Sequence, residues 1–363
     1  MKIKIDAIDT LFFKDGKPFS MGEETWADGI FPPPPSVIYG ALRTTFFSEN
    51  PNELSKANTN DDPTQNLVIK EISFTYGETE YVPIPLDYAK KKNEKVNIAY
   101  RLKPETMINL SSSSLNNNFL RLSPSENIEE IESVDEAIIS FSSLKRYLKG
   151  EESKVSYIKL SDLVLSEPKI GIGRDDALHT TDEGKLYRVG LKRLYEKKEN
   201  GNKINSLSLL VAFDGLDLPE KGLIKLGAEG KAAKYSLIQD EVQVFTDDEL
   251  DKINDKSFII YLLTPALFKN GWYPDFMNNE LTKNLGLELV TASIGKPISL
   301  AGFDMVKKIP KLMRKAVPGG SVFFVKSNQV SFKEVYKSLN NKSISEYNRK
   351  EGLGLCFIGR YYD

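Results

Sequence analysis

Residues 31–47 read FPPPPSVIYGALRTTFF, four consecutive prolines followed by a segment with helical spacing. Because proline fixes φ, Pro32 to Pro35 predict a stiff polyproline II rod that cannot itself continue into a helix. Ser36 is the expected N-cap of the helix that follows. Apolar residues then recur at helical spacing, at Val37, Ala41, Leu42 and Phe46. The plainest interpretation is a rigid helix entry, while Ser36, Tyr39 and Arg43 leave a binding role open.

Strand patterns flank this helix. Residues 2–13 alternate, and 67–77 and 81–89 predict a hairpin that turns at 77–80, which gives the order β, α, β, β. A long hairpin is expected at about 168–196, and a polar, irregular insertion at 90–130. Helices are expected at 133–150, capped by Ser133, and at 331–340. Further strands are expected at 205–216, 224–237, 257–268, 288–305 and 321–327.

This order is rich in strands and has no repeated βαβ unit, so it predicts an α+β fold. Two ferredoxin-like (RRM-like) domains would account for it. The polar stretch 247–257 is the best boundary, which gives an N-terminal domain at 1–250, including the hairpin at about 168–196, and a C-terminal domain at 251–363.

The composition excludes several classes of protein. Lys and Arg number 49 against 51 Asp and Glu, a balance that argues against a non-specific coat on nucleic acid. Cys356 and His179 are the only residues of their types, so no intrachain disulfide, Cys/His metal site or two-histidine mechanism is possible. No apolar run is long enough to span a membrane, and we expect a soluble, cytoplasmic protein.

Three stretches could contact phosphate, and each has a plainer alternative. GLGLCFIG at 352–359 starts like a dinucleotide loop, but only four residues follow it, so no helix can open there. Its glycines could admit a phosphate or could mark a bulged terminal strand. KKIPKLMRK at 307–315 is a basic run or a solvated face, and LGAEGKAAKY at 226–235 is a nucleotide loop or a simple turn.

Several of these stretches together resemble one family. They are LFFKDGKPF, FPPPPSVIYGALRT, IGRDDALHTTDEGKLY, LGAEGK, YLLTPALFKNGWYPD, ISLAGFDMVKKIPKLMRKAVPGGSV and GLGLCFIG, in this order along nearly the whole chain. The chain resembles the third Cmr subunit of type III-B CRISPR effector complexes, in the RAMP superfamily. It departs mildly from that pattern at Ala301-Gly302-Phe303-Asp304 and at Ala228.

The resemblance implies ferredoxin-like domains with a projecting β-hairpin and glycine-rich loops. It implies an RNA-binding subunit without catalysis, metal or cofactor, which holds the 5′ tag of the CRISPR RNA and docks the large polymerase-like subunit and the adjacent backbone subunit. Glycine N–H groups and basic side chains would hold phosphates, and aromatic side chains would stack on bases. The expected RNA-binding residues are Phe13, Lys14, Lys17, Phe19, Ser36, Tyr39, Gly40, Arg43, Arg174, His179, Lys185, Gly227, Gly230, Lys231, Lys307, Lys308, Arg314, Gly352 and Gly354.

Two alternatives remain open. The first is a RAMP-type endoribonuclease that processes CRISPR precursor RNA, with His179 as general acid or base and Lys185 or Tyr187 as a partner. Loss of repeat-RNA cleavage in His179→Ala would favour that alternative. The second is a metabolic α+β enzyme, which would need a carboxylate pair in one pocket.

Overall fold

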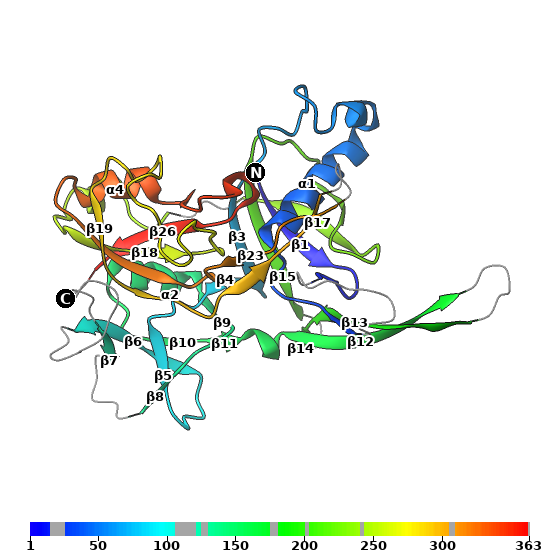
Figure 1. The fold of residues 1–363 in the computed structure, drawn as a ribbon. Coiled ribbons are helices and arrows are strands. Elements are labelled where there is room, and N and C mark those ends of the chain that lie inside the picture. The colour runs from blue at the N-terminus through cyan, green and yellow to red at the C-terminus, as the bar shows by residue number, and fades with distance from the viewer. Residues whose placement is uncertain are drawn as a thin grey trace. The chain divides into compact units, whose positions relative to one another are not determined.

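The structure is a computed structural model that describes residues 1–14, 26–105, 121–124, 130–174, 181–199, 203–239, 243–304 and 309–361. The chain forms two compact units, each assembled from three stretches (Figure 1). The first unit comprises Met1–Ile69, Ser161–Ile238 and Ser299–Lys315, and the second comprises Lys70–Leu160, Gln239–Ile298 and Ala316–Asp363. Compact units need not coincide with folding domains, so the predicted division at residue 250 stays a prediction.

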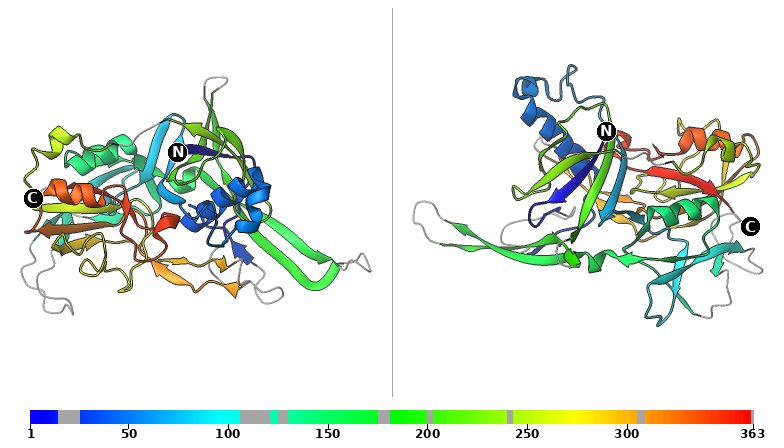
Figure 2. Two further views of the ribbon diagram at one scale, coloured as in Figure 1. Left: turned by 90° about the horizontal axis from the view of Figure 1, so that it is seen from above. Right: turned by 180° about the vertical axis from the view of Figure 1, so that it is seen from behind.

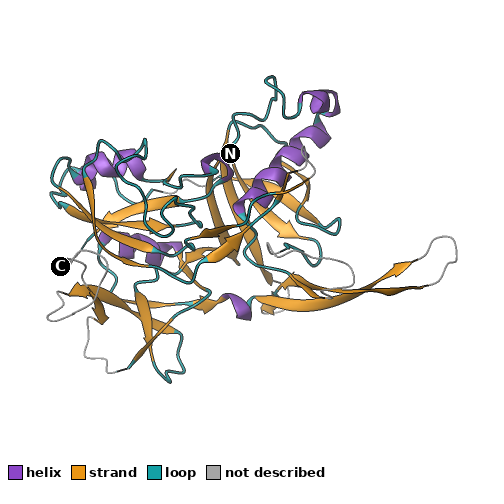
Figure 3. Cartoon of the chain, in the orientation of Figure 1, coloured by secondary structure: helices purple, strands orange, loops and turns teal. Residues whose placement is uncertain are grey.

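Strands make up most of the regular structure, and the helices are few and short (Figure 3). The strands form several separate sheets in which nearly all pairs are antiparallel. The predicted α+β class is therefore confirmed.

Antiparallel strands form the centre of the first unit. In spatial order they are β15 (Lys203–Asp214), β1 (Lys2–Ala7), β17 (Ala232–Ile238) and β16 (Lys221–Lys225), with β14 (Glu196–Glu199) paired to β15. Ile3 and Ile5 of β1 are buried, as the alternation predicts. Helix α1 (Pro35–Glu49) packs against β16, and a short 3-10 helix, η1 (Pro51–Lys56), follows it.

The predicted long hairpin is present in the first unit. It consists of β12 (Val164–Arg174) and β13 (Thr181–Leu194), which form a ribbon that reaches away from the rest of this unit (Figures 1 and 2). At its base, β2 (Trp26–Asp28) pairs with β13 in parallel, so the hairpin is tied to the N-terminal part of the chain. A 3-10 turn, η2 (Leu160–Asp162), precedes it.

Helix α1 begins two residues earlier than the sequence predicts. Pro35 is its first residue and Pro34 is the N-cap, with φ −56° and ψ 139° and no side-chain cap. The prediction of Ser36 as N-cap is therefore wrong, and the proline rod is shorter than four residues. The physical reason is that the first helical position needs no N–H donor and favours the fixed φ of proline.

A second antiparallel sheet forms the core of the second unit. In spatial order its strands are β19 (Leu287–Ser293), β24 (Val322–Ser327), β18 (Ser257–Leu262), β26 (Leu355–Arg360) and β25 (Lys342–Ser343). Helices α2 (Phe141–Lys149) and α4 (Phe332–Leu339) pack against β26. The predicted helix at 331–340 is confirmed, with Ser331 and Glu334 forming a capping box.

The predicted helix at 133–150 is partly wrong. Residues 137–140 form β9 (Ala137–Ser140), which pairs with β4 (Thr79–Pro83) and β11 (Ile158–Lys159), and Ser140 is the true N-cap of α2. Consecutive buried residues, Ile138 and Ile139, fit a strand with both faces covered better than an amphipathic helix. The predicted hairpin of β3 (Val68–Tyr76) with β4 and the helix end at Gly150 are present, but the second strand, predicted at 81–89, runs only from Thr79 to Pro83, and residues 88–91 belong to another sheet.

The insertion predicted at 90–130 is not wholly irregular. Strands run through its described part and its flanks, in the order β10 (Lys154–Ser156), β6 (Ile98–Glu105), β5 (Tyr88–Lys91) and β8 (Ile131–Ser133), with β7 (Arg121–Pro124) on β6.

Asp87 is buried beside this sheet, accepts a hydrogen bond from the Tyr147 hydroxyl at 2.8 Å and lies 3.4 Å from Arg101 Nε. Burial raises the pKa of the Asp87 carboxyl, although the Arg101 charge opposes this.

The remaining elements are short. They are α3 (Asp247–Leu250), η3 (Arg349–Glu351), β20 (Ile298–Leu300), β21 (Phe303–Asp304), β22 (Ile309–Pro310) and β23 (Arg314–Ala316). No helix among the described residues is long and apolar enough to cross a membrane.

The single cysteine gives a direct test of the second unit's packing. Cys356 is buried in β26, and burial raises the pKa of its thiol to about 12. At pH 8 we expect the native thiol to react with an aromatic disulfide reagent about a thousandfold more slowly than an exposed cysteine, because the thiolate is the nucleophile. Protein unfolded in urea is the control and should release one equivalent promptly; equal rates in both states would contradict the packing.

Candidate functional site

Four stretches of the first unit meet at one place, which we call the crossing. They are residues 9–14, Asp28 and Gly29, the base of the hairpin (164–169 and 188–193) and the loop 226–231 between β16 and β17. Leu11 and Lys192 exchange two backbone hydrogen bonds, at 2.8 and 2.7 Å. The N–H of Ala228 donates to Phe12 O at 2.9 Å, so the glycine loop is joined to the N-terminal segment.

A small apolar cluster lies beneath these backbone contacts. It consists of Phe12, Ala27, Val189 and Leu191, each at most 6% exposed. Removing such side chains from water is the main favourable contribution to holding the stretches together. The cluster therefore fixes the base of the hairpin against the N-terminal segment.

Two glycines allow the backbones to approach this closely. The Gly29 N–H donates to Gly190 O at 3.0 Å, and a Cβ at Gly29 would lie only 2.2 Å from that oxygen. Gly227 has φ +87°, and a Cβ there would lie 2.4 Å from Phe12 O. A side chain at either position would collide with backbone, so the crossing requires glycine.

Charged side chains surround the crossing. Arg193 Nε donates to Glu167 Oε2 at 2.6 Å, and its Nη2 lies 3.3 Å from Asp9 Oδ1. Lys231 Nζ donates to Thr10 Oγ1 at 2.8 Å and lies 3.6 Å from Asp9 Oδ2. The Thr10 backbone N–H and the charges of Lys231 and Arg193 hold the pKa of Asp9 below its usual value.

A second pair connects the loop with the hairpin. Lys169 Nζ lies 3.5 Å from Glu229 Oε2, and Glu229 itself has a positive φ of 57°. The neighbouring Lys192 Nζ donates to Ser166 Oγ at 2.8 Å. Lys169 and Arg193 are about half exposed, so the crossing presents cations to solvent on a rigid backbone.

Cations beside an exposed glycine turn suit one kind of ligand. Phosphate groups bind to Lys and Arg side chains and approach closely where glycine leaves the backbone uncovered. No group of three or more His, Cys, Asp or Glu residues in the described part of the chain is arranged to hold a metal ion. The geometry of the crossing thus favours binding of a phosphate backbone.

The crossing brings together five of the residues predicted to bind RNA. They are Phe13, Lys14, Gly227, Gly230 and Lys231. Lys14 is exposed, and its backbone forms an isolated β-bridge with Gly29. Phe13, in contrast, is only 2% exposed. The predicted stacking of Phe13 on a base is therefore replaced by packing within the unit.

The predicted residues of α1 lie on one stripe of that helix. Ser36, Tyr39, Gly40 and Arg43 follow the spacing of a single face, beside the buried face that includes Ile38 and Leu42. The guanidinium of Arg43 turns toward residues 58–64: its Nη2 lies 2.6 Å from Asp62 Oδ2 and its Nε donates to Thr64 Oγ1 at 2.7 Å. Arg43 therefore holds this turn in place.

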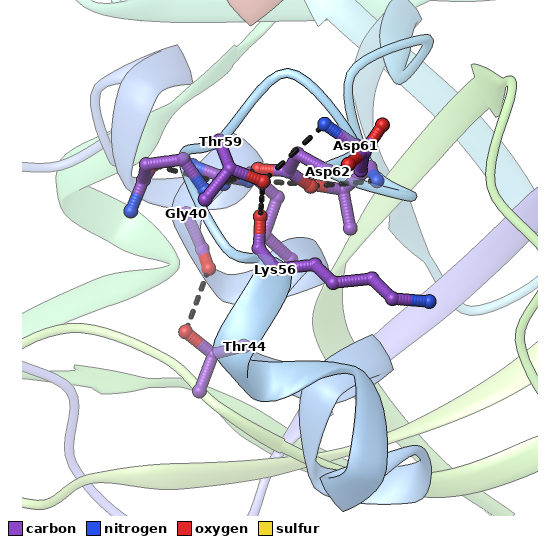
Figure 4. A network of polar contacts seen from close by, with 9 residues as sticks. Gly40, Thr44, Lys56, Thr59, Asp61 and Asp62 are labelled. Atoms are coloured by element: carbon purple, nitrogen blue, oxygen red, sulfur yellow. Dashed lines mark hydrogen bonds and ion pairs between the residues drawn. The ribbon is translucent and has the colours of Figure 1, made fainter.

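Figure 4 shows the surroundings of this turn. Thr44 donates to the Gly40 carbonyl at 2.9 Å within α1. Thr59 donates to the Lys56 carbonyl and accepts from the Asp61 N–H, which closes the turn next to Asp62. The stripe on α1 thus ends at a compact, internally bonded turn.

Gly352 and Gly354 lie elsewhere, in the second unit. Both are buried, and their N–H groups donate to Arg349 O at 3.1 Å and to Pro265 O at 2.7 Å. A Cβ at Gly354 would lie 2.5 Å from the Ser345 nitrogen. These contacts support the packing alternative that the sequence leaves open, and we leave both glycines out of the proposed site.

The other predicted residues lie in strands or outside the described residues. Arg314 lies in β23, and Arg174 and Lys185 lie in the strands of the hairpin. Lys17, Phe19, His179, Lys307 and Lys308 lie outside the described residues.

Sequence reasoning missed Arg193, Lys169 and the three carboxylates Asp9, Glu167 and Glu229. The basic character of the hairpin is visible in the sequence. The positions that face the glycine loop depend, however, on the hairpin register and on a contact between residues some 220 positions apart, as in Lys231 to Thr10. No local pattern carries that information.

Comparison with known families covers nearly the whole chain. Residues 3–361 match the family described as CRISPR-associated protein (Cas_Cmr3). The chain belongs to this family. The resemblance inferred from the sequence motifs is thereby confirmed, and no curated protein sequence matches the chain.

A chain of one solved structure shares this fold, and chains of two others are less similar. A chain of the cryo-EM structure of the Type III-B Cmr-beta bound to cognate target RNA and AMPPnP, state 1, has 17% identity and a TM-score of 0.51, with 89% of this chain and 86% of that chain covered. The Cmr-beta structure bound to cognate target RNA gives 19% identity and a TM-score of 0.47 over 89% and 86%. A chain of the Csm3-Csm4 subcomplex of a type III-A complex gives 12% and 0.34 over 90% and 94%.

Two glycines in one loop give a matched test of the crossing. Gly227 and Gly230 both have positive φ, but a Cβ at Gly230 meets nothing within 4 Å. Gly230→Ala should lower the free energy of unfolding by about 1 kcal/mol, the cost of a left-handed non-glycine residue. Gly227→Ala should cost at least about 2 kcal/mol, because it adds a clash with Phe12 O. Urea unfolding followed by circular dichroism measures both, and equal losses would contradict the contact.

Arg43→Ala tests the turn beside α1. Burial would raise the pKa of Asp62, but hydrogen bonds from Thr64 and Asn58 and the Arg43 charge hold it below its usual value. A carboxyl with a lowered pKa in the folded state stabilises the fold above its unfolded pKa, and this contribution is lost as the pH falls. We expect Arg43→Ala to cost about 2 kcal/mol at pH 7 and less below about pH 4.

The control for that experiment is Lys56→Ala. Lys56 pairs with Glu53 at 2.7 Å but is half exposed, where water screens the pair, so its loss should leave the free energy of unfolding close to the wild-type value. An Arg43→Ala penalty that does not change with pH would show that Asp62 is not its partner in solution.

Proposed function

We propose that this chain is the RNA-holding subunit of a type III-B CRISPR effector complex, acting in the cytoplasm in antiviral defence. It holds the 5′ tag of the CRISPR RNA at the crossing. The observation that carries the proposal is the convergence of Lys169, Arg193 and Lys231 beside an exposed glycine turn. Membership of the Cas_Cmr3 family and a fold shared with a chain of an RNA-bound Cmr-beta complex support it.

The RNA backbone is held by charge and by close approach. Half-exposed cations neutralise phosphates, and the glycines leave room for the backbone beside loop 226–231. Helix α1, which carries Ser36 and Tyr39, packs against β16, the strand that leads into this loop, and we propose that these two residues extend the same surface. Arg174, Lys185 and His179 are proposed as further contacts to the RNA.

The chain acts by binding, and catalysis belongs to other subunits. It docks the large polymerase-like subunit and the adjacent backbone subunit, as the resemblance implies. A metal-independent nuclease typically needs an acid and a base, and His179 is the only histidine in the sequence. We therefore propose that His179 contacts RNA and does not act as a catalytic acid or base.

Arg193→Ala tests the RNA surface. In the assembled complex we expect the affinity for CRISPR RNA with its 5′ tag to fall about fivefold at physiological salt. The slope of log affinity against log salt should become shallower by about 0.7, since one phosphate contact to a single strand is lost. Fluorescence anisotropy over a salt series measures both quantities.

Lys326→Ala is the matched control. Lys326 is 46% exposed, as is Arg193, and it also pairs with a carboxylate, Glu288, at 2.9 Å, but it lies in the second unit. We expect its affinity and salt slope to stay at the wild-type values. Equal effects of the two substitutions would contradict a localised RNA surface at the crossing.

A further inference from the structure

Three cations at the crossing, Arg193, Lys231 and Lys169, already face carboxylates of the chain itself. Asp9 lies between Arg193 and Lys231, at 3.3 and 3.6 Å, and Glu167 accepts from Arg193 at 2.6 Å. Asp9 therefore binds two cations that come from different stretches, one on the hairpin and one after the glycine loop. Carboxylate and phosphate oxygens form the same kind of charge-assisted hydrogen bonds with Arg and Lys side chains, so the two groups compete for these cations.

The ion pair between Lys169 and Glu229 has the same arrangement. Lys169 of the hairpin lies 3.5 Å from Glu229 at the tip of loop 226–231. Glu229 has a positive φ, a conformation uncommon for residues other than glycine, which places its carboxylate on the exposed turn between Gly227 and Gly230. A glycine or asparagine would adopt this backbone more readily, so the local conformation alone does not favour glutamate.

These carboxylates are accessible to solvent. Asp9 is 59% exposed and Glu167 47% exposed at the side chain, so the pairs are of the weak, water-screened kind. A correctly placed phosphate can therefore displace them at little cost. A nucleic acid in any other position leaves the carboxylates paired with their cations, and the carboxylates then repel its phosphates.

We propose that Asp9, Glu167 and Glu229 are specificity-determining residues that hold the cations of the crossing in place and exclude nucleic acid that does not displace them. This inference rests on the proposed function, namely that the crossing binds RNA. Non-specific binding is driven by release of small counterions from the nucleic acid. Carboxylates of the chain already neutralise the cations, so every RNA gains less free energy on binding. Only an RNA backbone that contacts several of the cations at once recovers this free energy.

The test compares two RNAs on the full chain. One is a fluorescent CRISPR RNA with its own 5′ tag, and the other has the same length with the tag scrambled. Asp9→Asn should raise the affinity for the scrambled RNA about fivefold, the effect of removing a like charge about 4 Å from a phosphate. The affinity for the tagged RNA should rise less, so the ratio of the two affinities should fall.

Two further variants guard against local damage. Glu229→Gln keeps the size of the side chain and should change the affinities in the same direction as Asp9→Asn. Glu288→Gln removes a carboxylate that is about as exposed as that of Asp9 and pairs with Lys326 in the second unit, so it should change neither affinity. Thermal unfolding checks that each variant is folded, and if Asp9→Asn fails to fold, Glu229→Gln and Glu167→Gln decide the question.

The outcomes separate the inference from the proposed function. If Arg193→Ala leaves both affinities unchanged, the crossing does not bind RNA and both proposals fail. If Arg193→Ala weakens binding while the carboxylate variants leave the ratio of affinities at the wild-type value, the proposed function stands and the specificity role is overturned.

Discussion

The first unit depends on a close passage of backbones that only glycine permits. Gly29 donates to Gly190 O, and Gly227 lies against Phe12 O, at distances where a Cβ would sit 2.2 and 2.4 Å from an oxygen. Because the N-terminal segment is fixed between the hairpin and loop 226–231, residues far apart in sequence share one surface. The cluster of Phe12, Ala27, Val189 and Leu191 then stabilises this arrangement by burial.

Electrostatics at the crossing follow from that geometry. The cations of the hairpin and the loop converge because their backbones do, and Lys169, Arg193 and Lys231 are each paired with a carboxylate of the same unit. This local balance agrees with the whole sequence, in which 49 basic residues face 51 acidic ones. A protein with this charge pattern is suited to bind one nucleic acid site in a defined register and not to coat nucleic acid without preference.

The sequence predicted the elements whose signals are local. The hairpin at 168–196, the helix at 331–340 and the turn between β3 and β4 follow from alternation, turn residues and caps. Where proline and burial compete with capping rules, as at Pro35 and at β9, the prediction was wrong by a few residues. Strand register and long-range contacts determine which residues belong to the site, so the sequence did not indicate Arg193 and Asp9 as site residues. The guanidinium of Arg43 faces Asp62.

If this chain holds the CRISPR RNA as proposed, the 5′ tag lies at the crossing. Photo-crosslinking of the assembled complex, with a 4-thiouridine in the 5′ tag of the CRISPR RNA and mass-spectrometric mapping, tests this most directly. We expect crosslinked peptides from residues 9–14, 188–193 and 226–231 of the first unit. Crosslinks to this chain that fall only in the second unit, with none at those three stretches, would contradict it.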